Sequence, residues 1–259
     1  MKVAALIPAR YHSSRLPGKP LADIAGEPMI RWVYERARSA SLVNELWVAT
    51  DDERIYSAVK DFGGNCWITS PKHLSGTDRI AEIAKKRDWD LVVNVQGDEP
   101  LIDPAMVDAV IIALQEDSLS DVSTLKKKIT AVDEIFDPNV VKVVTDKKGC
   151  ALYFSRAPIP YFRDTWEKIK SIGNVPSTFS VFKHVGLYAY KREALLHITG
   201  VKPTPLEKIE RLEQLRFLEN GFKIKVKTTQ KDSVSVDSPD DLSRVRRLIK
   251  SKGISCTYK

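Results

Sequence analysis

The first half of the chain alternates short apolar runs with stretches in which apolar residues recur every three or four positions. The runs predict four strands, at residues 2–7, 45–50, 66–69 and 91–95. The run at 91–95 is the most apolar of them and is therefore the expected centre of the sheet. The periodic stretches predict four helices, at residues 28–37, 55–62, 77–84 and 104–114. Strands that alternate with helices in this way predict a mostly parallel sheet built from crossover units.

The second half of the chain is less regular. Its strand patterns lie at residues 140–145, 151–155, 185–190 and 224–226. Residues 206–220 are predicted to form one helix, and a last helix is predicted after Ser238. Residues 164–178 are polar and lack periodicity, which predicts an exposed, mobile loop. We therefore expect one α/β domain with an embedded, more antiparallel lobe.

The charge of the chain bears on its partners. The 259 residues include 41 Lys and Arg against 34 Asp and Glu, a formal net charge of +7. This balance fits a nucleic-acid-binding protein or an enzyme with anionic substrates. Much of the positive charge lies in short clusters that we predict to be solvated helix or turn faces, at residues 85–87, 126–128 and 246–247. No nucleic-acid-binding motif accompanies them, which favours the enzyme.

Cysteine usage and hydropathy indicate the compartment. No apolar run reaches the roughly 18 residues of a membrane span, and a strand pattern follows Met1 directly, where a secretory signal would have its apolar segment. Cys66, Cys150 and Cys256 are an odd number of cysteines without metal-binding spacing. We expect reduced thiols in a cytoplasmic protein without membrane insertion.

A basic loop follows the first predicted strand, with the sequence RYHSSRLPGK at residues 10–19. Ligands of open α/β sheets bind in the crevice at the carboxyl ends of the strands, where this loop is expected. Arg10, Arg15 and Lys19 suit a polyanion such as a nucleoside triphosphate, although a lone basic loop can also be an ordinary polar connection. The loop matches neither GxxxxGK[ST] nor GxGxxG, which disfavours P-loop phosphotransfer and Rossmann dinucleotide binding.

Two aspartates are candidate metal ligands. Asp98 follows the central predicted strand, so its carboxylate is expected in the crevice, where Mg²⁺ would take one or two carboxylates with phosphate oxygens and water. The alternative, about equally supported, is that Asp98 and Glu99 cap the turn before Pro100. Asp237 precedes the cap of the last helix and is not explained by the helix dipole, so it is the candidate for a second ligand.

A polar turn precedes the third predicted helix. Ser75 or Thr77 can serve simply as the cap of that helix. The functional alternative is that the hydroxyls and amides of this turn, with Arg79, recognise the edge of a nucleobase or a sugar.

Eight motifs follow one another across nearly the whole chain. They are IPARYHSSRLPGKPL, SGTDRIAE, NVQGDEPLI, NVVKVVTD, ALYFSRAPIP, KHVGLYAY, LEQLRFLENG and VDSPDDL. This ordered series resembles the 3-deoxy-manno-octulosonate (Kdo) cytidylyltransferases, also called CMP-Kdo synthetases. The resemblance implies transfer of CMP from CTP to the acidic eight-carbon sugar Kdo, with release of pyrophosphate, for lipopolysaccharide synthesis. It also implies a Mg²⁺-dependent cytoplasmic homodimer with a Rossmann-like three-layer fold.

The resemblance further implies a single nucleotidyltransferase domain over residues 1–259, with residues 140–215 as the lobe for dimerisation and sugar binding. Arg10, Arg15 and Lys19 would hold the triphosphate and neutralise charge that develops on the leaving pyrophosphate. Asp98 would bind Mg²⁺ on the phosphates, and both metal ligands, Asp98 and Asp237, would hold a second Mg²⁺ beside the sugar. The implied catalytic residues are Arg15, Lys19, Asp98 and Asp237.

The other residues implied by the resemblance surround the two substrates. Cytosine and ribose would be framed by Ala9, Ser75, Thr77 and Gln96. The sugar would be bound by Arg15, Gln96, Tyr153, Ser155, Arg156, His184, Tyr188, Glu213 and Gln214. Arg156 can meet the sugar's carboxylate with two hydrogen bonds. His184 and the two tyrosines have an alternative as buried structural residues. Glu213 and Gln214 are expected to face away from the apolar stripe of their helix.

The chain departs from the family pattern at three positions. Ser235, Cys150 and Lys191 stand where glycine, tyrosine and arginine are usual, and none is an implied metal or phosphate ligand. Two alternatives stay open. One is a relative that acts on another acidic sugar, such as 8-amino-Kdo or sialic acid, although the sialic acid enzymes have a differently spaced basic loop. The other is a non-catalytic protein that binds nucleic acid or another anion.

Overall fold

The computed structural model describes residues 1–13, 15–163, 169, 175 and 180–257. Within them, a nine-stranded sheet contains a path of seven strands in the order β11-β7-β10-β6-β1-β4-β5. These strands are β1 (Val3–Ala9), β4 (Glu45–Thr50), β5 (Cys66–Ile68), β6 (Leu91–Asn94), β7 (Val122–Lys128), β10 (Phe182–Lys191) and β11 (Ile224–Thr228). β6 is the middle strand of this path, as its apolar sequence predicted.

Four of the six neighbouring pairs along this path are parallel. β1 pairs in parallel with β4 and β6, β4 with β5, and β7 with β11. β10 runs antiparallel between β6 and β7. The remaining strands, β8 (Lys142–Thr145) and β9 (Ala151–Ser155), are antiparallel to each other, and β8 joins β10 at the pair Lys142 and Lys183. The prediction of an α/β fold with a mostly parallel sheet and a smaller antiparallel part is confirmed.

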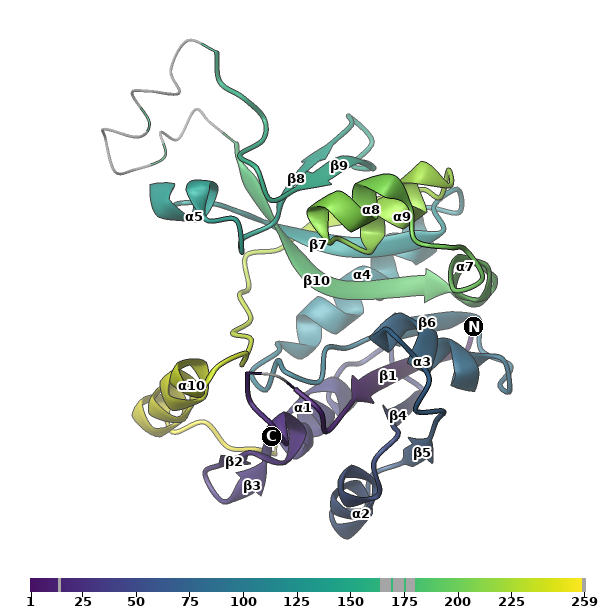
Figure 1. The fold of residues 1–259 in the computed structure, drawn as a ribbon, viewed down its shortest axis with the longest axis vertical. Helices are drawn as coiled ribbons and strands as arrows, with labels where there is room; N and C mark the ends of the chain where they lie inside the picture. Colours follow the sequence, from purple (N-terminus) through teal and green to yellow (C-terminus); the bar gives the residue numbers. More distant parts are fainter. Residues whose placement is uncertain (14, 164–168, 170–174, 176–179, 258–259) are drawn as a thin grey trace.

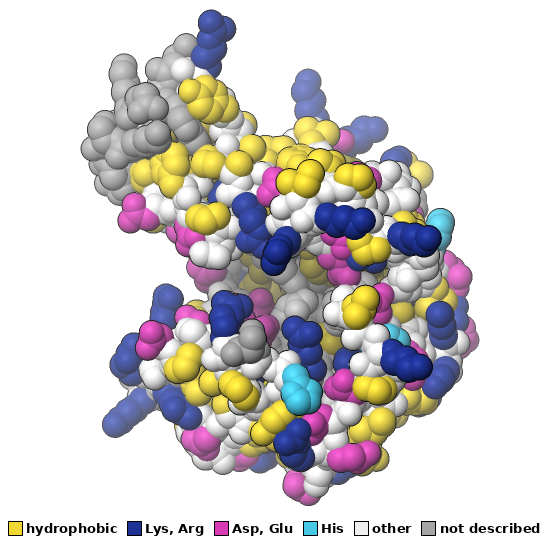
Figure 2. Space-filling view, in the orientation of Figure 1, with side chains coloured by type: hydrophobic (Ala, Val, Ile, Leu, Met, Phe, Trp, Pro, Cys, Tyr) yellow, Lys and Arg dark blue, Asp and Glu magenta, His cyan; other side chains and the backbone are white. Residues whose placement is uncertain are grey.

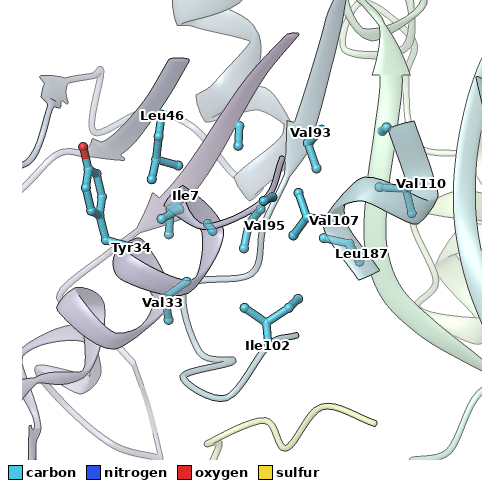
Figure 3. Close-up of a cluster of buried hydrophobic side chains, with 14 of the residues drawn as sticks. Ile7, Val33, Tyr34, Leu46, Val93, Val95, Ile102, Val107, Val110 and Leu187 are labelled. Atoms are coloured by element: carbon cyan, nitrogen blue, oxygen red, sulfur yellow. The ribbon is translucent and has the colours of Figure 1, made fainter. Parts of the chain in front are cut away.

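Helices cover both faces of the sheet and make three layers (Figure 1). On one face lie α1 (Met29–Arg38), α2 (Glu53–Asp61) and α4 (Pro104–Glu116), and on the other lie α3 (Gly76–Ala84), α7 (Arg192–Ile198) and α9 (Gln214–Glu219). Successive residues of a strand point to opposite faces, so Ile7 of β1 packs toward Val33 and Tyr34 of α1 (Figure 3), whereas Leu6 contributes to the opposite core.

Two lobes are visible in Figure 1. We call β1, β4, β5 and β6 with α1, α2, α3 and α10 (Pro239–Lys252) the lower lobe. The upper lobe consists of β7, β8, β9 and β10 with α5 (Val132–Phe136), α8 (Pro205–Glu210) and α9. The lower lobe also contains the short elements η1 (Lys19–Leu21), β2 (Asp23–Ile24) and β3 (Glu27–Pro28). α10 packs Val245 and Ile249 against Trp32 of α1, which fixes the segment before α10 beside the ends of β1 and β6.

Two sequence predictions were wrong. Residues 126–128, predicted as a solvated helix or turn, form the end of β7, and the ammonium group of Lys127 lies 2.9 Å from a carboxylate oxygen of Asp232. Residues 206–220 form two short helices, α8 and α9, instead of one, because Arg211 between them adopts a left-handed conformation with φ of 53°.

The segment 164–178, predicted as a mobile loop, lies outside the described residues except for Ile169 and Val175. Among the helices of the described residues, none is both long and apolar enough to cross a membrane.

Candidate active site

A cleft of about 320 Å³ lies at the carboxyl ends of β1 and β6, next to the N-terminus of α3. Figure 2 shows the molecule hollowed between the two lobes, with Lys and Arg side chains on the lower side of the hollow. The cleft is lined by these residues of the sequence prediction: Ala9, Arg10, Arg15, Lys19, Ser75, Gln96, Asp98 and Asp237. The structure therefore brings together both predicted metal ligands, the three predicted triphosphate ligands and three predicted nucleoside contacts.

The basic loop enters the cleft through a tight return of its backbone. Gly18 has φ of 69°, a left-handed conformation that favours glycine, and its N–H donates to the carbonyl of Tyr11 at 2.9 Å. Lys19 then begins the short helix η1, which directs its ammonium group toward two carboxylates. Lys19 Nζ lies 2.7 Å from Asp98 Oδ2 and 3.2 Å from Asp237 Oδ1.

The two carboxylates meet because of a single backbone hydrogen bond between distant segments. The N–H of Val236 donates to the carbonyl of Asp98 at 2.8 Å, which places Asp237 next to Asp98. Arg15 Nη2 also lies 3.2 Å from Asp237 Oδ1. Two negative charges so close together repel each other, and the cations of Lys19 and Arg15 offset that repulsion.

Gly97 allows this strand end to approach β1. A Cβ atom at residue 97 would lie 2.8 Å from the carbonyl oxygen of Pro8, closer than real Cβ contacts. Glu99, which follows Asp98, is buried away from the cleft, and burial raises its pKa to about 7. The turn therefore separates two neighbouring acids, with Asp98 in the cleft and Glu99 in the interior.

The turn before α3 caps the helix, as one of its two alternatives predicted, and part of it lies at the cleft. Ser75 caps α3 by accepting a hydrogen bond from the N–H of Asp78 at 3.1 Å, and Ser75 also lines the cleft. Thr77 does not line the cleft. It is buried and donates from Oγ1 to Glu213 Oε2 at 2.5 Å, across to the upper lobe.

Further residues line the cleft. Arg79 was considered from the sequence as an alternative recognition residue, and the others were not singled out. Arg79 is buried, with Nη2 3.0 Å from Asp51 Oδ2 and Nη1 2.6 Å from Thr69 Oγ1. His73, which precedes α3, has Nε2 2.7 Å from Oε2 of Glu82 within α3. Ser13, Leu74 and Gly76 complete this rim. These residues lie within or directly before the motifs RYHSSR and SGTDR, and this position in the sequence could have identified them as lining residues.

The predicted sugar ligands of β9 lie in the upper lobe and do not line the cleft. Ser155 Oγ donates to Glu210 Oε1 at 2.7 Å. The Arg156 guanidinium is held by backbone carbonyls, with Nε 2.7 Å from the oxygen of Glu210 and Nη1 2.8 Å from that of Pro138. Tyr153 is half-buried, and burial raises the pKa of its hydroxyl.

His184 and Tyr188, also predicted as sugar ligands, pack into the aromatic interior of the upper lobe. The His184 ring lies 5.0 Å from the Phe154 ring and 5.4 Å from the Tyr188 ring, and its Nε2 lies 2.9 Å from Thr124 Oγ1. Burial lowers the pKa of His184 to about 3. Burial also raises the pKa of Tyr188, which stacks on Tyr190.

Glu213 and Gln214 were expected to face away from the apolar stripe of their helix, and neither side chain is fully exposed. Gln214 is buried, and burial raises the pKa of Glu213. The break at Arg211 turns this segment so that both side chains point into the protein, where Glu213 accepts the hydrogen bond from Thr77.

Comparisons with known proteins agree with this geometry. A family model described as cytidylyltransferase matches residues 4–226. A 3-deoxy-manno-octulosonate cytidylyltransferase of Geotalea daltonii is 54% identical and covers 98% of this chain and 100% of its own length. One of Geobacter metallireducens is also 54% identical, over 95% of this chain and 96% of its own length.

Two solved cytidylyltransferase structures are similar to this chain in fold. A CMP:2-keto-3-deoxy-manno-octonic acid synthetase complexed with CTP has a TM-score of 0.89 and 42% identity, covering 97% of this chain and 100% of that chain. A cytidylyltransferase of Leptospira borgpetersenii, 17% identical over 100% of this chain and 90% of that chain, has a TM-score of 0.64 and shares the fold. Because relatives of about half identical sequence match along almost the entire length, the chain belongs to the 3-deoxy-manno-octulosonate cytidylyltransferase family.

Proposed function

We propose that this protein transfers CMP from CTP to the anomeric 2-hydroxyl of Kdo, releasing pyrophosphate, and so supplies CMP-Kdo for lipopolysaccharide synthesis. The observation that carries the proposal is the cleft in which Lys19 joins Asp98 to Asp237 beside Arg10 and Arg15. A nucleotidyl transfer needs cations around the phosphates and carboxylates for a metal, and the cleft contains both. The names of the relatives and the CTP complex of the similar structure support the choice of substrates.

In this proposal the basic loop receives the triphosphate. Arg10 and Arg15 are exposed at the cleft, so their guanidinium groups can reach phosphate oxygens without leaving a packed position. Lys19 is held between two carboxylates and is available to neutralise negative charge that develops on the α-phosphate. Ala9, Ser75 and Gln96 line the same cleft and are the proposed contacts of the nucleoside, to which Thr77 contributes through the turn that it anchors.

The carboxylate pair fits Mg²⁺. Asp98 Oδ2 and Asp237 Oδ1 both lie within 3.2 Å of the Lys19 ammonium nitrogen, so the two carboxylates already share one cation. In the described part of the chain, no group of three or more His, Cys, Asp or Glu residues is arranged to hold a metal. Two carboxylates completed by phosphate oxygens and water is the ligand set that Mg²⁺ prefers. When bound, Mg²⁺ would neutralise phosphate charge and acidify the attacking hydroxyl.

The sugar is proposed to bind on the side of the cleft that faces the upper lobe. Arg15 and Gln96 would contact it from the lower lobe. The upper lobe would contribute Tyr153, Ser155, Arg156, His184, Tyr188, Glu213 and Gln214. Arg156 Nη2 makes only a 3.5 Å contact with the Arg211 carbonyl, which leaves it the guanidinium nitrogen best able to bind the sugar's carboxylate.

Several wider features are proposed with the function. We propose that residues 1–259 act as one domain, that residues 140–215 include the dimer contacts, and that the homodimer works in the cytoplasm. Light scattering after gel filtration measures the mass of the particle in solution, and a mass near 29.2 kDa, that of one chain, would contradict the dimer.

Pyrophosphate release tests the proposed reaction. Purified protein is mixed with CTP, Mg²⁺ and Kdo, and in parallel with 8-amino-Kdo or sialic acid. Release with Kdo supports the proposal, release only with another acidic sugar changes the substrate, and no release with any nucleoside triphosphate and acidic sugar refutes the enzyme and leaves the anion-binding alternative.

Asp98→Asn tests the proposed metal site. We expect turnover to fall by about 10²-fold or more, because the amide carries no charge for the metal, while the protein stays folded. Asp88→Asn is the matched control, because Asp88 is fully exposed and lies 3.8 Å from Lys2, outside the cleft. Retained activity in Asp98→Asn would remove Asp98 from the metal site.

A further inference from the structure

We propose that Tyr11 is a positioning residue that holds the basic loop in the shape that presents its cations to the triphosphate. Two groups lie against the ring of Tyr11. One is Gly18, where a Cβ atom would lie 3.1 Å from the ring carbon Cζ. The second is the guanidinium of Arg54, whose Cζ is 3.3 Å from the ring centroid. The proposal rests on the triphosphate site given under the proposed function.

The outer part of this stack is anchored on α2. Asp52 binds the guanidinium of Arg54 with both carboxylate oxygens, at 3.0 Å to Nε and 2.7 Å to Nη2. The same carboxylate caps α2 by accepting a hydrogen bond from the backbone N–H of Arg54 at 3.0 Å. Arg54 is therefore fixed in orientation, and a planar cation at this distance stabilises the face of an aromatic ring.

The inner part of the stack closes the loop. The carbonyl of Tyr11 accepts the hydrogen bond of the Gly18 N–H, so the chain returns to its starting point between these two residues. Arg10 precedes this closure, Arg15 lies within it and Lys19 follows it, so one contact sets the position of all three cations. Tyr11 also packs against the core beneath β1, which ties the loop to the rigid sheet.

Neither Tyr11 nor Arg54 lines the cleft. Two guanidinium nitrogens of Arg54, Nε and Nη2, are directed at Asp52, so we do not count this residue among the phosphate ligands of the cleft. Both residues therefore act through the loop. A loop that is already ordered loses less conformational entropy when the triphosphate binds, and this preorganisation raises affinity.

The first measurement is calorimetric titration of CTP with Mg²⁺ in the absence of sugar. In Tyr11→Leu, which fills similar core space without the aromatic face, we expect CTP affinity to fall about 3- to 30-fold. Tyr11→Phe keeps the ring and is expected to remain within about twofold of the wild type. In steady-state kinetics, the KM for CTP should rise in Tyr11→Leu while the KM for the sugar stays unchanged. Wild-type CTP affinity in a folded Tyr11→Leu, or an equal rise in both KM values, would overturn the proposal.

A second substitution, at an exposed residue, leaves the hydrophobic core unchanged. Arg54→Gln removes the outer part of the stack from an exposed position, and Lys60→Gln removes the same charge from an exposed position of the same helix. We expect Arg54→Gln to weaken CTP binding more than Lys60→Gln does. If the two variants weaken CTP binding equally, the loss of positive charge alone explains the effect. That result would overturn the proposed role of the contact between Arg54 and Tyr11.

Arg15→Ala separates this proposal from the one on which it rests. Weaker CTP binding in Arg15→Ala together with wild-type binding in Tyr11→Leu would refute the role of Tyr11 alone. Wild-type binding in Arg15→Ala would refute the triphosphate assignment of the loop and the role of Tyr11 with it. Weaker CTP binding in Arg15→Ala and in Tyr11→Leu, with near-wild-type binding in Tyr11→Phe, would support both proposals.

Discussion

Acidification should destabilise this protein through His184. Thr124 Oγ1 lies 2.8 Å from the carbonyl of Leu187 and 3.0 Å from that of Val185, so its single proton is used by a carbonyl. The hydroxyl must then accept from His184 Nε2, which places a proton on Nε2 and leaves Nδ1 as the nitrogen that would be protonated on acidification. Burial holds the pKa of this imidazole near 3, against an ordinary value of 6.5.

The sign and size of the effect follow from this difference in pKa. The folded state binds the proton less well than the unfolded state, so the stability is fully present above pH 6.5 and is lost as pH falls toward 3. At pH 5 the unfolded imidazole is protonated and the folded one is neutral, which costs about 2 kcal/mol relative to pH 8. With a urea m-value of about 3 kcal/mol/M, this corresponds to a midpoint about 0.7 M lower.

The assay is urea denaturation at pH 8, 6 and 5 for the wild type and His184→Gln. Glutamine can still donate to Thr124 but does not titrate, so the variant should lose about 2 kcal/mol less than the wild type between pH 8 and 5. His197→Gln is the matched control, since that side chain is exposed. If His184→Gln and the wild type lose equal stability, the pKa of His184 is not lowered in the folded state, and its role as a solvent-accessible sugar ligand gains support.

Three further predictions concern other positions. Gly97→Ala places a Cβ 2.8 Å from the Pro8 carbonyl, so we expect about 1–3 kcal/mol of lost stability in thermal denaturation and a marked loss of turnover, whereas wild-type values would contradict the close approach. Thr77→Val removes a donor from the buried Glu213 carboxyl, which should cost about 1–3 kcal/mol in urea denaturation; an unchanged midpoint would show that the hydrogen bond is not made. Burial raises the pKa of the Cys66 thiol to about 12, so Ellman's reagent should modify Cys66 only after unfolding, and modification of the native protein would contradict its burial.

The sequence predicted the lower lobe well because local patterns determine it. Its four strands in the main sheet, β1, β4, β5 and β6, are apolar runs, and α1 to α3 each have one apolar face, so the periodicity locates these elements. β7 was missed because its first half, Val122–Leu125, includes buried Ser123 and Thr124, and its second half is three lysines. Its place in the sheet depends on pairing with β10 and β11, which no local pattern records.

The meeting of the basic loop with Asp98 was predictable because strand ends of a parallel sheet converge on one edge. That rule places Arg10 and Asp98 in the same crevice without knowledge of any side-chain contact. The stack of Arg54 on Tyr11 was not predictable in this way, because it depends on how the first turn of α2 lies against the basic loop. The meeting of Asp98 with Asp237 likewise depends on one long-range backbone hydrogen bond, that from Val236.

The Thr77–Glu213 hydrogen bond affects how mutational effects can be assigned to the proposed nucleotide site or to the proposed sugar site. The motifs assign Thr77 to the nucleotide and Glu213 to the sugar, as if each acted within its own half of the site. Their side chains are in fact 2.5 Å apart, and the same carboxyl is also hydrogen-bonded by Ser75, which lines the cleft. A change on either side therefore disturbs a contact that both lobes share, and effects at residues in contact are not additive. A loss of sugar binding in a Glu213 variant consequently identifies a sugar ligand only if CTP binding, measured alone, is unchanged.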